Sequence, residues 1–265
     1  MATELSKVAR SIRAAQRIAI VAHISPDPDA IGSALGLMHS LAALGKQIVP
    51  LCDDGIPAEL AFLPGIEQMQ RELPPDFEPE AVIALDASDT ERLGAQAALL
   101  EREGVLAVNI DHHVTNLNYG ELNLVDTSAA ATAELLVRVI DEVGAPLTPE
   151  AATCLMAGLV GDTRSFSIPG VTPATLRVAA RLVEAGADLS DISERVMQRR
   201  TYGSLVLWNL GLSRMHLEDG VAWTSLPLAE REALNLLSID GKGMSNLLLS
   251  IDEAYISAVF TERTD

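Results

Sequence analysis

The chain has 265 residues, of which 48% are hydrophobic and 3% aromatic, and its formal net charge is −18 at pH 7. This length and apolar content suffice for one large domain, or for two, with a sizeable core. The negative charge argues against long polyphosphate backbones as partners, because proteins hold those with stripes of lysine and arginine; the alternative is that the acidity serves only solubility. So few aromatic residues also argue against a platform that stacks many bases.

The sequence shows no segment that would insert into a membrane or direct export. No uninterrupted apolar run reaches the roughly 18 residues expected of a membrane helix. The N-terminal segment lacks the apolar core of a secretion signal, and Cys52 and Cys154 are the only cysteines. We therefore expect a cytoplasmic protein with no disulfide framework and no membrane partner.

In the first half of the chain, apolar runs that predict strands alternate with segments of helical spacing. The predicted strands lie at 17–23, 46–52, 81–86 and 105–111, and the predicted helices at 4–15, 30–44, 57–62 and 90–102. This alternation predicts an α/β fold, with a mostly parallel sheet flanked by helices and right-handed crossovers.

The second half is mainly helical and ends in a small lobe. Helical spacing recurs at 128–143, 149–160, 172–185, 189–199 and 202–212. Strands are then predicted at 220–227 and 254–261, with helices at 228–237 and 244–250 between them. We expect these last elements to form a partial C-terminal α/β lobe that is small to stand alone.

The segment VAHISPDPDAIGS, residues 21–33, places one histidine and two aspartates at the end of the first predicted strand. Its two prolines restrict the backbone, so His23, Asp27 and Asp29 would be held in fixed directions. The carboxyl ends of strands are where open α/β sheets place their ligands. The alternative is a polar turn in which Asp27 or Asp29 caps the following helix.

Further acidic and imidazole groups stand at comparable positions along the chain. Asp86 ends AVIALD, Asp111 ends VLAVNID directly before His112 and His113, and Asp162 follows an apolar helix. One such aspartate is more often a helix cap, but donors from four loops at one sheet edge predict a metal cluster. This mixture suits Mn²⁺, Zn²⁺, Fe²⁺ or Co²⁺ better than Ca²⁺. Two such ions form a clamp for displacement at phosphorus.

Four motifs carry a resemblance to a known family: HISPDPD at 23–29, LD at 85–86, DHH at 111–113 and GD at 161–162. Their order and context resemble those of the DHH phosphoesterase superfamily, over residues 18 to 188. The chain is most similar to the bacterial group of oligoribonucleases and 3′-phosphoadenosine-5′-phosphate (pAp) phosphatases, with cyclic-di-AMP phosphodiesterases nearby.

The C-terminal lobe resembles the first half of the companion DHHA1 domain. Full-length relatives end with a glycine-rich GGGH segment that helps to grip the nucleotide, and no such segment occurs before Asp265. We therefore expect an incomplete DHHA1 domain, in either a truncated or a natural short form. The predicted domains are a DHH domain at 1–188, a helical linker at 189–215 and a partial DHHA1-like substrate-binding domain at 216–265.

The resemblance implies two divalent metal ions, with Mn²⁺ expected, and assigns their ligands by matching motif positions. One ion would be held by His23, Asp27 and Asp86, and the other by Asp29, Asp86, His112 and Asp162, so that Asp86 bridges the two.

The same resemblance gives the remaining motif residues catalytic roles. His113 would lie beside the substrate phosphate and donate to an oxygen or to the leaving group; the alternative is a hydrogen bond behind the metal ligands. Asp111 would fix the histidine pair in place, or would make a purely structural contact at the strand end.

Asn116 and Arg164 are candidate substrate-binding residues, because one trails the DHH motif and the other lies two residues past Asp162. The alternatives are an Asx turn for Asn116 and a plain surface position for Arg164, where many relatives carry glycine. Glu134 is expected to be solvated or to lie behind the metal ligands. GKGMS at 241–245 lacks the upstream glycine spacing of a phosphate loop, and we interpret it as a turn before a helix.

The resemblance thus implies a metal-dependent phosphoesterase that acts on short oligonucleotides or small nucleotides. Short RNA, pAp and a cyclic dinucleotide or its linear product are the expected substrates, with hydroxide bridging two ions as nucleophile. We expect no binding of long duplex nucleic acid, and a homodimer is allowed. One alternative is a family II-like inorganic pyrophosphatase, which would need a late Lys/Arg cluster where this tail has only Lys242 and Arg263. Another is a non-catalytic nucleotide-sensing protein.

Overall fold

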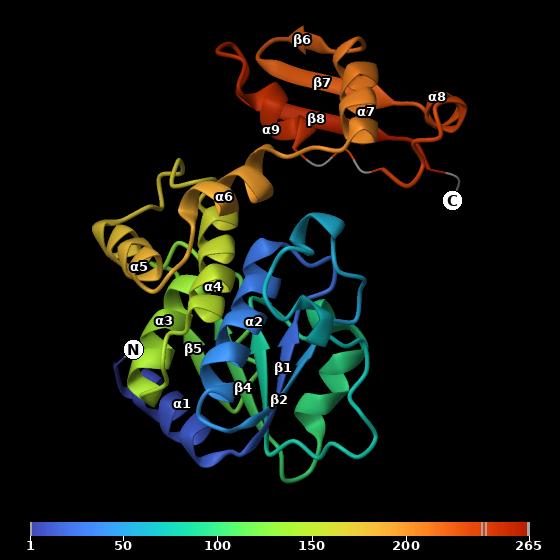
Figure 1. The fold of residues 1–265 in the computed structure, drawn as a ribbon. Coiled ribbons are helices and arrows are strands. Elements are labelled where there is room, and N and C mark those ends of the chain that lie inside the picture. Colours follow the sequence, from blue (N-terminus) through green and yellow to red (C-terminus); the bar gives the residue numbers. More distant parts are fainter. Residues whose placement is uncertain (1, 240, 242, 264–265) are drawn as a thin grey trace. The chain divides into compact units, whose positions relative to one another are not determined.

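A computed structural model describes residues 2–239, 241 and 243–263. The chain divides into two compact units, which meet in the sequence at residues 198 and 199 (Figure 1). The segment predicted as a linker contributes helices to both units. Within its described residues the structure has no helix long and apolar enough to cross a membrane.

The first unit is built on a five-stranded parallel sheet with the strand order β2-β1-β3-β4-β5. Its strands are β1 (Arg17–Ala22), β2 (Gln47–Leu51), β3 (Ala81–Leu85), β4 (Leu106–Asp111) and β5 (Leu122–Val125). β1, β3 and β4 lie adjacent in the sheet, so their carboxyl ends meet at one edge. The predicted parallel sheet flanked by helices is confirmed.

Both faces of this sheet are buried, as the continuous apolar runs of the strands require. On β1, Ile20 packs in one cluster with residues of the long helices, whereas the neighbouring Val21 packs with Leu93 and Leu99 on the opposite face. The helices are α1 (Ala2–Ala14), α2 (Pro28–Ala42), α3 (Thr132–Val143), α4 (Pro149–Asp162), α5 (Pro173–Glu184) and α6 (Leu189–Ser193).

Some predicted helices take a different form. The segment at 90–102 is a 3-10 helix, η3 (Glu91–Glu101), which is interrupted at Gly94 (φ +58°, ψ −140°). The interruption coincides with a loop contact, because Asp53 Oδ2 accepts a hydrogen bond from Ala95 N at 3.0 Å. The short 3-10 turn η1 (Ala58–Leu60) replaces the helix predicted at 57–62, and a second such turn, η2 (Ile66–Gln68), follows it. Helix α6 continues into the π-helical turn η4 (Glu194–Gln198).

The second unit is a three-stranded sheet with helices. β6 (His216–Glu218) pairs antiparallel with β7 (Val221–Leu226), which pairs parallel with β8 (Ile256–Thr261). The helices are α7 (Tyr202–Leu212), α8 (Leu228–Ala233) and α9 (Met244–Leu249). Its core contains Leu207, Leu210, Leu226, Leu236 and Met244. The predicted small C-terminal lobe is confirmed.

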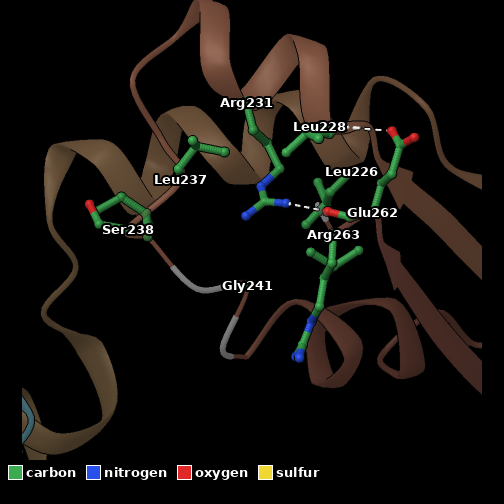
Figure 2. A pocket seen from close by; sticks show the side chains of 10 residues that line it. Leu226, Leu228, Arg231, Leu237, Ser238, Gly241, Glu262 and Arg263 are labelled. Carbon is green, nitrogen blue, oxygen red and sulfur yellow. Dashed lines mark hydrogen bonds between the residues drawn. The ribbon is translucent and has the colours of Figure 1, made fainter. Parts of the chain in front are cut away.

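Arg231 is buried in this lobe beside a pocket at the carboxyl ends of β7 and β8 (Figure 2). Its Nη1 donates to the main-chain oxygen of Glu262 at 2.8 Å, and the Glu262 carboxylate accepts from Leu228 N at 2.8 Å. These two hydrogen bonds fasten α8 to the residue that follows β8.

The C-terminal lobe differs from the sequence expectation in one helix, and one predicted turn lies partly outside the described residues. The helix predicted at 228–237 ends earlier, because Asn235 adopts a left-handed backbone conformation (φ +54°) that a helix cannot continue through. In the GKGMS segment, Lys242 lies outside the described residues, and Met244 begins α9 as the turn-before-helix prediction requires.

Candidate metal centre

The carboxyl edge of the sheet in the first unit brings the predicted site residues together. His23 directly follows β1, Asp86 directly follows β3, and Asp111 ends β4. Asp29 lies in the first turn of α2, and Asp162 is the last residue of α4. Because parallel strands leave the sheet at the same edge, residues distant in the sequence meet there.

Carboxylate and imidazole atoms at this edge form three groups that could each hold a metal ion. The groups are His23 with Asp27 and Asp86, Asp29 with His112 and Asp162, and Asp86 with His112 and His113, and within each group the ligand atoms lie within 4.8 Å of one another. Asp86 belongs to two of the groups. The same carboxylate could therefore serve either group.

His23 and Asp27 are fixed by hydrogen bonds that leave one atom of each directed at the site. Nδ1 of His23 bonds to Ile24 O at 2.7 Å, and the imidazole is 2% exposed. Asp27 Oδ1 caps α2 by accepting from the backbone of Asp29 and Ala30. His23 Nε2 then lies 3.7 Å from Asp27 Oδ2. The capping alternative for Asp27 is thus compatible with a role as a metal ligand.

Asp29 is fully buried and bound to the N-terminus of α3. Its Oδ2 accepts from Thr132 N at 2.6 Å, and its Oδ1 accepts from Ala133 N at 3.0 Å. A Cβ atom added at Gly158 of α4 would lie 2.6 Å from Asp29 Oδ1. The carboxylate therefore occupies a space that α4 leaves open only because glycine stands at that position.

Asp86 is held in a strained conformation between the two halves of the site. Its backbone is left-handed (φ +59°), which is unfavourable for a residue other than glycine, and the side chain is only 1% exposed. Oδ1 accepts from Thr132 Oγ1 at 2.9 Å and lies 3.6 Å from His112 Nε2. Oδ2 lies 3.6 Å from His23 Nε2. Each oxygen therefore faces a different imidazole.

The pKa values show how strongly these groups interact. Burial alone lowers the pKa of His23 and of His112, but the neighbouring carboxylates raise both to about 10. Burial, together with repulsion between carboxylates, raises the pKa of Asp29. Burial likewise raises the pKa of Asp86, against the opposing hydrogen bond from His23. The closely spaced carboxylates are therefore stabilised by nearby positive charge. Divalent cations would supply that charge without requiring the imidazoles to be protonated.

One imidazole nitrogen at the centre lacks a partner. Nε2 of His112 is shielded from solvent and has no hydrogen-bond partner among the described residues, although Asp162 Oδ2 lies 3.1 Å away. The other ring nitrogen, Nδ1, lies 3.3 Å from Ala129 O, which fixes the ring. A metal-ligating histidine typically has this arrangement, with one nitrogen bound to a backbone carbonyl and the other directed at the ion. The residues present therefore fit a divalent cation.

Residues 17–159 match the model of the DHH family, N-terminal domain. The chain belongs to the DHH family. It is 40% identical over 185 residues to the bifunctional oligoribonuclease and PAP phosphatase NrnA of Thermus thermophilus, a match that covers 69% of this chain and 54% of that protein. It is 32% identical over 232 residues to the protein of the same name in Bacillus subtilis, covering 84% of this chain and 69% of that one.

Solved structures share this fold. An exopolyphosphatase-related protein from Bacteroides fragilis superposes with a TM-score of 0.92 at 25% identity, covering 100% of this chain and 81% of that one. A putative family II inorganic pyrophosphatase from Methanococcus jannaschii gives a TM-score of 0.55 at 20% identity, covering 92% of this chain and 82% of that one. The second likeness concerns the fold alone. The family predicted from the four motifs is confirmed.

In this DHH protein, the aspartate of the DHH motif lies behind the histidine pair. Asp111 is fully buried, and its Oδ1 lies 2.8 Å from His113 Nδ1 and accepts from His112 N at 2.8 Å. Burial raises the pKa of Asp111, but hydrogen bonds from His113 and Asn116 lower it below its usual value. The bond to Asp111 raises the pKa of His113. It also leaves Nε2 of this half-exposed ring free for another partner.

Asn116 is directed into the protein at this edge. Its Nδ2 donates to Asp111 Oδ2 at 2.6 Å and to Ala87 O at 3.0 Å. Its Oδ1 accepts from Asn109 Nδ2 at 2.8 Å and from Asn118 N at 2.7 Å. The amide thus completes the set of hydrogen bonds that orients Asp111, and it forms the Asx-type turn bond that was the alternative for this residue.

Arg164 lies on an exposed turn directly after α4. It adopts a left-handed conformation (φ +47°), as do the next two residues, Ser165 and Phe166. Thr163 is fully buried and fixes this turn, because its Oγ1 accepts from Phe166 N at 3.0 Å. A left-handed non-glycine run is unfavourable, so this turn, which places Arg164 two residues past Asp162, is formed at a conformational cost.

Burial excludes one of the two roles left open for Glu134, and a further residue, Thr132, was missed. Glu134 is buried, not solvated, because its Oε2 accepts from Ala130 N at 3.0 Å and from Thr175 Oγ1 at 2.9 Å. Thr132, which binds both Asp29 and Asp86, was not predicted. Its only sequence signal is a polar residue at the start of a helix, and such residues usually serve as caps.

Proposed function

We propose that this DHH protein hydrolyses phosphate esters of short oligonucleotides and small nucleotides, including pAp, with two divalent cations and Mn²⁺ as the preferred ion. The observation that carries the proposal is the set of three neighbouring groups of imidazole and carboxylate atoms that could each hold a metal ion. Two of these groups share His112, whose Nε2 is shielded from solvent and has no hydrogen-bond partner among the residues that the structure describes. The names of the relatives from Thermus thermophilus and Bacillus subtilis support the substrate class.

The proposed ligand sets follow the geometry of the site. His23, Asp27 and Asp86 would hold one cation, and Asp29, Asp86, His112 and Asp162 the other. When bound, a pair of divalent cations supplies an acidified water molecule and neutralises charge on the phosphate. The protein contributes rigidity, because almost every ligand also makes a hydrogen bond that fixes its orientation.

His113 would act on the substrate itself. Its Nδ1 is engaged by Asp111, so its Nε2 is the nitrogen that can donate to a phosphate oxygen or to the departing oxygen. Asp111 keeps this tautomer and, through its lowered pKa, stays ionised beside the imidazole. Arg164, which is exposed two residues past the end of α4, would supply a further positive charge to a phosphate.

The substrate would be small, because a chain of net charge −18 repels extended polyphosphate outside the metal centre. The lobe at 216–265 would contribute to substrate binding as a partial DHHA1-like domain. We also propose that the protein is cytoplasmic and forms a homodimer. Gel filtration with light scattering measures the molar mass in solution and so tests the homodimer.

A substrate panel tests the proposal. Purified protein with Mn²⁺ is given a dinucleotide, pAp, cyclic-di-AMP and pyrophosphate, and Asp162→Ala serves as the matched control. We expect turnover of the dinucleotide or pAp, and its loss in the variant. Turnover of pyrophosphate alone would replace the proposal with the pyrophosphatase alternative. Bound metal without turnover of any substrate would support a sensor.

A further inference from the structure

Asn109 is a polar residue inside β4, between the apolar Val108 and Ile110. Its side chain is fully buried, and its Nδ2 donates to Asn116 Oδ1 at 2.8 Å and to Asn123 Oδ1 at 3.1 Å. Its Oδ1 accepts from Asn116 Nδ2 at 3.4 Å. A buried amide destabilises a strand unless its polar atoms are paired, and here both the nitrogen and the oxygen are paired with other amides.

The orientation of these amides is imposed by the backbone. A backbone N–H can only donate, so Gly120 N, which lies 3.0 Å from Asn123 Oδ1, requires that oxygen to face it. Asn123 Nδ2 in turn donates to Gly120 O at 2.6 Å, which prevents the amide from reversing. Asn109 must therefore present its Nδ2 to Asn123, and the same Nδ2 faces the oxygen of Asn116.

Asn109 anchors Asn116 to the interior of the sheet. Two other partners of Asn116 lie in loops, because Asn118 N donates to its Oδ1 at 2.7 Å and its Nδ2 donates to Ala87 O at 3.0 Å. Its Nδ2 also donates to Asp111 Oδ2 at 2.6 Å. A reversed Asn116 amide would place its oxygen against this carboxylate, so the orientation that Asn109 imposes keeps a donor on Asp111.

The segment that carries Asn116 has little other attachment through apolar side chains. Val114 and Leu117 are 86% and 71% exposed, although both are apolar. His113 directly precedes this segment, and its Nδ1 lies 2.8 Å from Asp111 Oδ1. The row of buried amides therefore joins the sheet to the carboxylate that orients His113.

We propose that Asn109 is a positioning residue for phosphate-ester hydrolysis, which acts through Asn116 and Asp111 to fix the ring of His113. A role in catalysis rests on the proposed function, in which His113 acts on the substrate. Asn109 belongs to none of the three groups that could hold a metal ion. Its loss should therefore lower kcat and leave both KM and metal content nearly unchanged.

Steady-state kinetics on pAp with Mn²⁺ test this role in the full chain. Asn109→Ala removes the amide, and we expect kcat to fall about tenfold, as is typical when a group that orients a functional side chain is lost, with KM changed by about twofold or less. Val108→Ala is the matched control, because Val108 is fully buried in the same strand and its side chain lies on the opposite face, in the apolar cluster. All variants are assayed below their thermal unfolding transitions, and we expect the wild-type kcat in the control.

A double-mutant cycle with Asn116→Ala separates positioning from a general loss of stability. If Asn109 acts through Asn116, the double variant loses about as much kcat as Asn116→Ala alone. Two independent tenfold losses would instead multiply to about 100-fold.

Proton–nitrogen NMR of the metal-free protein reports the amide orientation without depending on activity. The side-chain amide signals of Asn116 are identified by their absence from the spectrum of Asn116→Ala. We expect these protons to exchange slowly with solvent in the wild type and about tenfold faster in Asn109→Ala, because one hydrogen bond that holds the amide is lost.

The outcomes separate the explanations. A selective loss of kcat, a non-additive cycle and faster exchange of the Asn116 amide support the positioning role. Equal kcat in Asn109→Ala and Val108→Ala, multiplied losses in the double variant, unchanged amide exchange, or a kcat that excess Mn²⁺ restores would overturn it. A wild-type chain that turns over no substrate would overturn the proposed function and the catalytic role together, whereas an active wild type with an unaffected Asn109→Ala variant overturns the positioning role alone.

Discussion

Replacing Thr132 by valine removes one hydroxyl group from behind the metal centre and leaves the side-chain shape nearly unchanged. Thr132 is fully buried, and its Oγ1 donates to Asp86 Oδ1 at 2.9 Å. The backbone bond from Thr132 N to Asp29 Oδ2 is kept in any variant. The substitution therefore acts on the proposed bridging carboxylate alone.

The magnitude follows from the burial of both partners. A buried carboxylate oxygen that loses a donor destabilises the fold by about 1–3 kcal/mol, and Asp86 is only 1% exposed. A hydrogen-bond partner that orients a metal ligand is typically worth on the order of 10–100-fold in metal affinity. We expect Thr132→Val to weaken Mn²⁺ binding at the lower end of that range, since Asp86 stays in place through its neighbours.

Calorimetric Mn²⁺ titration and urea unfolding in EDTA measure the two effects separately. Thr132→Ser is the matched control, because it keeps the hydroxyl and loses only a methyl group. We expect wild-type metal affinity in Thr132→Ser and reduced affinity in Thr132→Val. If Thr132→Val bound Mn²⁺ as tightly as the wild type, the hydroxyl would have no part in holding the bridge and the reasoning would be refuted.

Three further predictions follow from the structure. Asn116→Ala removes the bond to Asp111 Oδ2 at 2.6 Å, so steady-state kinetics on pAp should show kcat reduced about tenfold with KM changed less; an equal change in KM would contradict this. Gly158→Ala places a methyl group against Asp29 Oδ1 and should cost about 1–3 kcal/mol in thermal unfolding, whereas an unchanged midpoint would contradict it. Burial raises the pKa of Asp126, but hydrogen bonds from Ser128 and Arg138 outweigh burial, so the net effect is a pKa below the usual value. The contribution of this carboxylate to stability is therefore present above about pH 4 and lost as the pH falls. Asp126→Asn should reduce this acid dependence, which urea unfolding at several pH values measures.

Much of the architecture of the first unit could be predicted because its strands are buried on both faces. β3 and the part of β1 after Arg17 are continuous apolar runs, β4 is apolar up to Asn109, and the predicted bounds of all three strands lie close to the observed ones. β5 was missed, because it is a short strand with alternating polar residues and only one buried position. The break of η3 at Gly94 depends on contact with a loop distant in sequence, and local spacing cannot reveal it.

The candidate metal ligands could be predicted from the sequence because they lie within the four motifs. The order of the four motifs places His23, Asp86 and His112 at one edge before any coordinates are known. The residues that orient these donors were not predictable, since Thr132 and the peptide groups around it act through three-dimensional contacts.

Metal content per chain is the most direct measurement. The protein is equilibrated with Mn²⁺, freed of unbound ion and analysed by inductively coupled plasma mass spectrometry, with Asp86→Asn as the variant that touches both proposed ligand sets. The account predicts two Mn²⁺ ions per wild-type chain and fewer than one in Asp86→Asn. A wild-type chain without bound metal, or a variant that still retains two ions, would contradict it.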